Sequence, residues 1–132
     1  MGLYGTAACM AADLVAAGES PEPRGAWRIA IGRVTRSATS RNKSCPRSTF
    51  LALCETGAVK GVPAGRYTAS PDNKRYALKA WHALLANPEL ADSSSDLWRV
   101  ATDGALKCQN GQVDVLLTLW RTDRLDGTHF RQ

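Results

Sequence analysis

With 132 residues, 44% of them hydrophobic and 22% charged, the chain has the composition of a folded globular domain rather than of a disordered protein. No apolar run approaches the roughly 20 residues that cross a bilayer, and the N-terminal segment lacks the basic residues of a signal peptide, so we expect a cytoplasmic protein that does not bind a membrane. The net charge of +5 excludes neither an acidic protein partner nor nucleic acid, so the distribution of charge carries more information than its total.

The spacing of apolar residues predicts helices along almost the whole chain. A first helix is expected from Thr6, a suitable N-cap residue, to Ala17, with Gly18 ending it. Two prolines in the GESPEP segment interrupt the chain, and a second helix is expected over residues 24–36. Its arginines lie opposite its apolar face, which consists of Trp27, Ala30, Ile31 and Val34. The following SATSRNKS segment predicts a flexible basic loop.

A third helix is expected to begin at Ser44 or Cys45, because Pro46 then occupies an early helical position where its missing N–H does no harm. Gly57 ends this helix. Residues 58–69 can form a short β-hairpin around a Pro-Ala-Gly turn. An irregular loop explains the same residues.

A fourth helix is predicted from the Ser70 cap and Pro71 to Asn87, a fifth from the serines of SSSDLW to Gly104, and a last one from near Asn110. Five or six such helices predict a mainly α fold, one compact bundle over residues 1–125 with a flexible tail at 126–132. Each tryptophan falls on a different apolar stripe, which indicates one shared core. These tryptophans are Trp27, Trp81, Trp98 and Trp120.

The charges are unevenly distributed along the sequence. Residues 24–79 contain twelve of the seventeen lysines and arginines but only two acidic residues, Glu55 and Asp72. Such segregation gives the molecule a dipolar field, and a basic middle is what a polyanionic partner would select. The alternative is that these residues form an ordinary solvated surface.

Two kinds of partner fit this basic middle. In a winged-helix arrangement, helix 46–56 would enter a nucleic-acid groove and the 58–69 hairpin would be the wing. Against this, the preceding polar connection is about eight residues long, whereas a helix-turn-helix uses three or four, and Glu55 would repel phosphate. We therefore favour an accessory or regulatory interaction module with an acidic protein partner. The candidate anion-binding residues are Arg47, Ser48, Lys60, Arg66, Lys74, Arg75 and Lys79.

A third hypothesis is a cysteine-dependent enzyme centred on Cys45. A thiolate would be favoured at a helix start beside Lys43 and Arg47, but no base is evident, since His82 is expected on a solvated face and His129 in the tail. The four cysteines lack metal-ligand spacing, and no phosphate-loop or zinc-protease motif occurs. We therefore expect no metal, no cofactor and no catalytic residue, and the sequence does not indicate an oligomeric state.

The central stretch resembles a known family. Residues 45–68 match the signature CP-x-x-x-F-L-x-L-C-E-x-G-x-V-K-G-x-P-x-G-x-Y-T of an uncharacterised family of small, mostly bacterial proteins, a domain of unknown function. Ala52 and Ala58 replace the Gly and Leu typical of the family, which changes packing volume more than chemistry. The likeness extends to NPEL at 87–90 and NGQVDVLLTLW at 110–120. It implies one domain over most of the chain and implies no activity.

Overall fold

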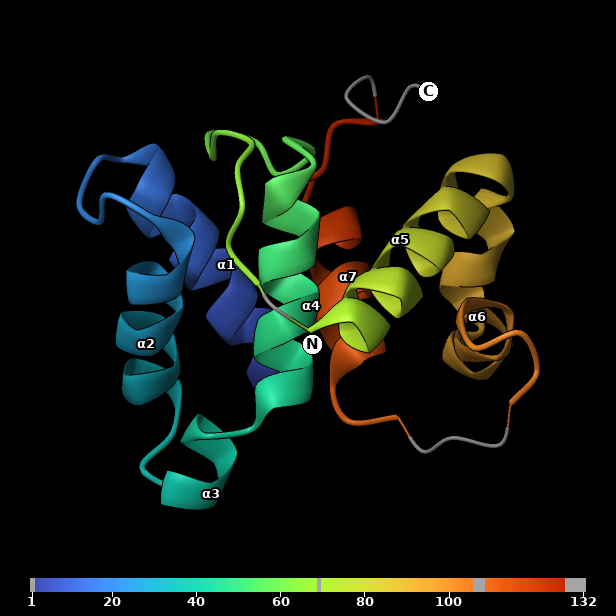
Figure 1. Ribbon diagram of the computed structural model, residues 1–132, viewed down its shortest axis with the longest axis horizontal. Helices are drawn as coiled ribbons and strands as arrows, with labels where there is room; N and C mark the ends of the chain where they lie inside the picture. The colour runs from blue at the N-terminus through green and yellow to red at the C-terminus, as the bar shows by residue number, and fades with distance from the viewer. Residues whose placement is uncertain (1, 69, 106–108, 128–132) are drawn as a thin grey trace.

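The computed structural model describes residues 2–68, 70–105 and 109–127 and confirms a mainly α fold (Figure 1). Each of the six expected helices is present, and two short ones accompany them. The longer helices are α1 (Leu3–Ala16), α2 (Pro23–Val34), α4 (Ser44–Glu55), α5 (Pro71–Ala86), α6 (Ser94–Ala101) and α7 (Gln112–Arg121). The short ones are α3 (Ala38–Arg41) and the 3-10 helix η1 (Pro88–Asp92). Among these described helices, none has the length and apolar character required to cross a bilayer.

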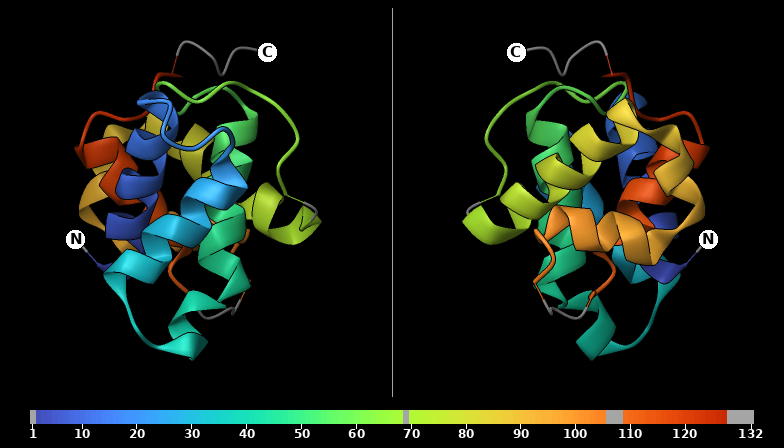
Figure 2. Two further views of the ribbon diagram at one scale, coloured as in Figure 1. Left: turned by 90° about the vertical axis from the view of Figure 1, so that its left-hand side faces the viewer. Right: turned by 90° about the vertical axis from the view of Figure 1, so that its right-hand side faces the viewer.

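Helix α4 lies in the middle of the molecule and packs on α2, α5 and α7, and α6 lies on the far side of α5 (Figure 1). The side views of Figure 2 show α2 facing the viewer on one side and α5 with α6 on the other. Helix α7 contacts α1, α4 and α5 and so connects the two sides. This arrangement makes α4 the axis of the fold rather than a surface helix.

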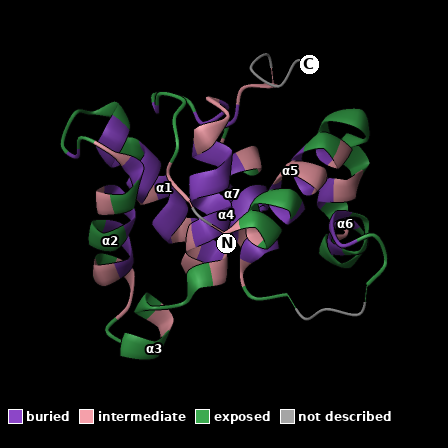
Figure 3. Cartoon of the chain, viewed as in Figure 1, coloured by how far each residue is buried: buried purple, intermediate pink, exposed green. Residues whose placement is uncertain are grey.

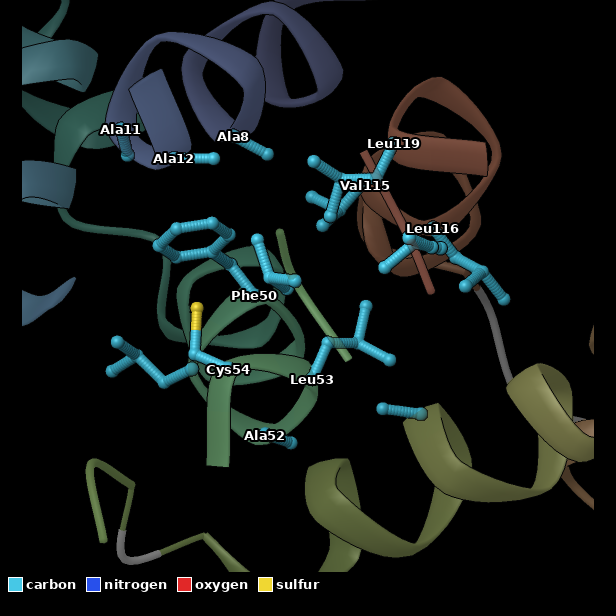
Figure 4. Packing of buried hydrophobic residues seen from close by; sticks show 14 of the residues in the cluster. Ala8, Ala11, Ala12, Phe50, Ala52, Leu53, Cys54, Val115, Leu116 and Leu119 are labelled. Atoms are coloured by element: carbon cyan, nitrogen blue, oxygen red, sulfur yellow. The ribbon is translucent and has the colours of Figure 1, made fainter. Parts of the chain in front are cut away.

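Because α4 lies at the centre, most of its residues are buried (Figure 3). Every residue of α4 from Ser48 to Cys54 is buried. Figure 4 shows Phe50 pointing from α4 toward the alanine face of α1, where Ala11 and Ala12 leave room for the ring. Removing a side chain of this size from water contributes roughly 1.5–3 kcal/mol, so α4 supplies much of the stabilising contact between the two sides of the bundle.

The tryptophans lie in or against this core, as predicted. Trp27 packs on Phe50 with ring centroids 5.5 Å apart, and Trp81 packs edge-on against Trp120 at 5.7 Å. Trp98 meets Tyr76 at 5.6 Å in a similar edge arrangement. Such tilted pairs are the favoured aromatic geometry. The aromatic residues of the described chain therefore join α2 to α4, α5 to α6 and α5 to α7.

Local capping signals place several helix starts where the sequence predicts them. The Ser70 hydroxyl accepts the N–H of Asn73 at 3.4 Å, and Pro71 occupies the first position of α5. The Ser93 hydroxyl accepts the N–H of Asp96 at 3.3 Å at the start of α6. These starts are correct because the sequence itself supplies the acceptor.

Helix α1 begins at Leu3, earlier than the predicted Thr6 cap, because its acceptor lies on another helix. The Asp114 carboxylate of α7 accepts the N–H of Gly2 at 3.0 Å and the N–H of Gly5 at 2.8 Å. Thr6 lies inside the helix, where its hydroxyl donates to the Gly2 carbonyl at 2.9 Å. Asp114 thus caps α1 from 109 residues away, which no local pattern reveals.

The expected flexible loop at 37–44 contains helix α3. The Ser37 hydroxyl accepts the N–H of Ser40 at 3.2 Å and so caps this single turn. The Arg41 side chain reaches back from α3 to the end of α2. The loop prediction was wrong for residues 38–41, because a serine cap and an arginine contact fix the turn.

The hairpin predicted at 58–69 is absent, and no strand forms within the described residues. Val59 instead makes an isolated antiparallel bridge with Leu125. Two flanking hydrogen bonds run from the Lys60 N–H to the Arg124 carbonyl (2.9 Å) and from the Asp126 N–H to the Ala58 carbonyl (2.7 Å). The partner of the first predicted strand is therefore the C-terminal segment. Of the predicted flexible tail, residues 128–132 lie outside the described residues.

Candidate anion-binding site

Acidic side chains, two from distant parts of the sequence and one from the same helix, neutralise three cations of the basic middle. The Lys60 ammonium lies 3.0 Å from the Asp123 carboxylate. Two further ion pairs on α5 join Lys79 to Asp103 and Arg75 to Asp72, the latter at 3.1 Å. These pairs are exposed and each contributes at most about 1 kcal/mol, but they reduce the positive field. The charge imbalance of the sequence is therefore smaller in the folded molecule.

Lys74 has a role inside the fold. Its ammonium lies 2.7 Å from the Glu55 carboxylate, whose side chain is only 6% exposed. Glu55 also accepts the N–H groups of Tyr67 (2.8 Å) and Thr68 (2.7 Å). Burial works to raise the pKa of the Glu55 carboxyl, but the hydrogen bonds from Lys74, Thr68 and Tyr67 outweigh burial and lower it. Glu55 thus ties the loop after α4 to the start of α5.

The interpretation of α4 as a recognition helix is incompatible with its position. Ser48 is 6% exposed, and the rest of α4 up to Cys54 is buried against neighbouring helices. Arg66 is exposed on the loop that follows, and no wing hairpin carries it. Of the seven candidate residues, the structure therefore places three on α5, two on the 56–70 loop and two on α4, and it does not gather them into one site.

Four arginines from three helices line one cleft of about 390 Å³ beside α2, α3 and the first half of α4, and we call it the arginine cleft. They are Arg24 and Arg28 of α2, Arg41 of α3 and Arg47 of α4. No acidic residue is among the described residues that line it. Arg47 is the one sequence-predicted site residue in this cleft. Four further cations of the basic middle, Arg33, Arg36, Lys43 and Arg66, also form no ion pair with a described residue, but they do not line this cleft.

Arg24, Arg28 and Arg47 form no ion pair with any described residue. Arg24 is the second residue of α2, where the Glu22 carboxylate caps the helix by accepting the N–H groups of Arg24 (3.1 Å) and Gly25 (2.5 Å). Arg47 is the fourth residue of α4, whose first turn contains no acidic residue. The helix dipole disfavours a cation at these positions. Arg47 has no such compensation from a described carboxylate, and a residue that breaks a local rule in this way is expected where a function requires it.

Arg41 is already held in position by the end of α2. Its Nε donates to the Thr35 carbonyl at 2.8 Å and its Nη2 to the Gly32 carbonyl at 3.1 Å. A guanidinium has five N–H donors, so most of its donors are still available after these two bonds. Because the side chain is fixed beforehand, binding an anion costs little additional side-chain entropy.

Trp27 and Gly32 also line the arginine cleft. Trp27 is only 2% exposed, and its buried indole N–H has no acceptor among the described residues. A Cβ added at Gly32 would meet nothing within 4 Å, so the glycine leaves open space above α2. The cleft therefore combines cationic side chains with an aromatic ring that is too buried to stack on a ligand.

Cys45 borders two other hollows of about 450 and 360 Å³ near the start of α4. Tyr76 and Asp72 line the smaller one, but no histidine is among the described lining residues of either. Cys45 is half-buried, whereas Cys9 and Cys54 are buried, and Cys108 lies outside the described residues. Asp72, which lines the smaller hollow, is ion-paired with Arg75 at 3.1 Å, and histidine, the commonest base for a thiol, is absent from the described lining residues.

Sequence reasoning missed Arg24, Arg28 and Arg41 as site residues. The i, i+4 spacing of Arg24 and Arg28, which places both on one helix face, was the available signal. Their meeting with Arg47 depends on how α2 packs beside α4 and on the turn of α3, neither of which a one-dimensional pattern specifies. The arginine cleft is a property of the tertiary structure.

Comparison with protein families gives a match over residues 1–126, to a family of unknown function, DUF6979. Comparison with curated proteins and with solved structures gives no match. The family match includes every described helix, from α1 to α7, together with the arginine cleft. The chain therefore belongs to the family of unknown function DUF6979.

Proposed function

We propose that this protein is a non-enzymatic accessory or regulatory module that binds an anionic segment of a partner protein in the arginine cleft. The supporting observation is that four arginines line one cleft without an acidic residue among its described lining residues, whereas three lysines of the basic middle are ion-paired. Lys60, Lys74 and Lys79 each form an ion pair with a carboxylate of the same chain. The arginines of the cleft are not paired with any described carboxylate, and the charge there is free to meet an acidic partner.

Nucleic-acid binding is the second candidate, in a geometry other than a winged helix. Lys43 is exposed at the start of α4 and directly follows Asn42, which lines the cleft. It extends the basic surface along which phosphates could be bound. Single-stranded nucleic acids, however, are usually bound by exposed aromatic rings together with basic side chains. Trp27, the aromatic residue of the cleft, is buried, and this favours the protein partner.

The hypothesis of a cysteine-dependent enzyme has the least support. A nucleophilic thiol needs an adjacent general base or another activating group. Among the described residues that border the hollows at Cys45, the titratable ones are Lys43, Asp72 and Tyr76. None of these is a histidine, the commonest general base, and the one carboxylate among them, Asp72, is paired with Arg75.

The proposal is tested by fluorescence anisotropy with a labelled oligoglutamate peptide and a labelled oligonucleotide, each across a salt series. Two double variants of equal net charge are compared, Arg28→Gln with Arg47→Gln and Lys60→Gln with Lys79→Gln. We expect the arginine variant to lose peptide binding at low salt and the lysine variant to retain it. Equal loss in both would show that net charge, not the cleft, binds the peptide. Tighter binding of the oligonucleotide would favour the second candidate.

A further inference from the structure

We propose that the arginine cleft recognises a phosphorylated serine or threonine side chain in an extended segment of the partner protein. This inference rests on the proposed function, because it specifies the chemistry of the anionic segment that the cleft would bind. It is carried by three features of the cleft: the amount of positive charge, the exclusive use of arginine, and the size of the space.

The charge of the cleft exceeds what one carboxylate can neutralise. Four arginines line the cleft, and no acidic residue is among its described lining residues. A carboxylate carries a single negative charge on two oxygens, whereas a phosphorylated side chain carries about −1.5 to −2 at neutral pH on three oxygens. The phosphoryl group is therefore the better match for several guanidinium groups around one space.

The cations of the cleft are all arginines. Arginine presents its N–H groups as a planar fork that binds phosphate oxygens in pairs, while lysine acts as a point charge. Arg24 and Arg28 are separated by one turn of α2, about 6 Å along the axis, so their long side chains can approach the same group. Arg41, fixed by the carbonyls of Thr35 and Gly32, offers a guanidinium that is already oriented.

The space limits the size of the occupant. A volume of about 390 Å³ holds a phosphorylated side chain with a short stretch of its backbone, and is at the low end for a ligand site. The open position above Gly32 widens the cleft along α2. Trp27 and Ile31 form the buried apolar floor of the cleft, so the arginines are the side chains left to contact the bound segment.

The experiment uses three libraries of fluorescein-labelled peptides with randomised flanks around a fixed phosphoserine, glutamate or serine, together with a single-stranded oligonucleotide. Anisotropy is measured with the full-length chain. We expect the phosphoserine library to bind about tenfold or more tightly than the serine library, in line with the strength of paired charge-assisted hydrogen bonds, and inorganic phosphate to compete. The glutamate library is expected to bind more weakly than the phosphoserine library.

Two variants test the place of binding, and a third is the matched control. Arg28→Gln removes a cation of the cleft. Gly32→Leu fills the open space, keeps every charge, and replaces a helical glycine by a good helix former, so it is expected to fold at least as well. Arg33→Gln removes the same charge from the exposed part of α2 outside the cleft. The first two are expected to weaken phosphoserine binding about tenfold, and the third to leave it unchanged.

The outcomes separate this inference from the proposed function. If glutamate and phosphoserine libraries bind equally and both depend on Arg28 and Gly32, the phosphoryl inference is wrong and the anion-binding module stands. If no library binds, or if neither Arg28→Gln nor Gly32→Leu changes the affinity, the inference and the proposed function are both wrong. If the oligonucleotide binds more tightly than the phosphoserine library and its binding depends on Arg28 and Gly32, nucleic-acid binding replaces both the inference and the proposed function.

Discussion

The Glu55 carboxylate, only 6% exposed, lies 2.7 Å from the Lys74 ammonium and accepts two backbone N–H groups as well. Replacing Glu55 by Gln removes the charge from these hydrogen bonds, and hydrogen bonds to a charged group contribute roughly 1.5–3 kcal/mol each. We expect Glu55→Gln to lower the free energy of unfolding by about 2 kcal/mol in urea denaturation at neutral pH. Glu19→Gln, in an exposed turn, is the control. Equal stability of both variants would contradict the role assigned to Glu55.

The same carboxylate gives stability a defined dependence on pH. The pKa of Glu55 is lower in the folded protein than its ordinary value. Its contribution is therefore complete above the unfolded value of about 4.3 and is lost as the pH falls through the folded value. We expect the stability difference between wild type and Glu55→Gln to shrink on acidification below about pH 4.3 and to be constant above pH 6. A difference that grows on acidification would have the wrong sign.

The cap that α7 supplies to α1 predicts an effect at a distance. Asp114→Ala leaves the N–H groups of Gly2 and Gly5 without their carboxylate acceptor. Loss of an N-cap typically costs about 1–2 kcal/mol, and we expect that loss in urea unfolding together with faster hydrogen exchange in the first turn of α1. Asp92→Ala, an exposed acid at the end of η1, is expected to change neither. Unchanged exchange in Asp114→Ala would rule out the cap.

Two helical glycines respond oppositely to the same substitution. A Cβ at Gly5 would lie 2.6 Å from the Thr118 Cβ, so Gly5→Ala must push α1 away from α7. A Cβ at Gly32 meets nothing, so Gly32→Ala should stabilise α2 by about 0.5–1 kcal/mol. Thermal unfolding of both variants checks the contrast. Stabilisation by Gly5→Ala would mean that α1 and α7 are farther apart than described.

The thiols differ in accessibility. Cys54 is fully buried, and burial together with the nearby Glu55 charge raises the pKa of its thiol well above the ordinary value. In a Cys108→Ser background, we expect iodoacetamide to modify Cys45 first in the folded protein and all three remaining thiols in denaturant. Peptide mass mapping identifies the modified residue. Modification of Cys54 at the rate of Cys45 would contradict the packing of α4.

The sequence predicts structure well where the determining atoms are neighbours in the chain. Helix α5 begins at Pro71 and ends before Asn87 as expected, because Ser70 and Pro71 define the start locally. The start of α1 was misplaced because its cap, Asp114, belongs to α7. The hairpin was wrong for the same kind of reason, since Val59 pairs with Leu125.

The candidate site was harder to predict than the fold. A list of cations gives no indication of which ones are neutralised, and Lys60 and Lys79 find their carboxylates on segments far along the chain. Arg47 was identified from its position at a helix start. Its neighbours Arg24 and Arg28 become part of the same site only when α2 lies beside α4, which is a consequence of tertiary packing.

The capping of α1 by Asp114 also has a consequence for how the chain is made. The first helix leaves the ribosome long before residue 114 has been synthesised, so its first N–H groups have only water as a partner during most of translation. The contacts that join α1 to α7 span almost the whole chain, and contacts of such separation slow folding because a long loop must be closed to form them. The side of α1 that packs against α7 therefore has no neighbour until the last helix has been synthesised.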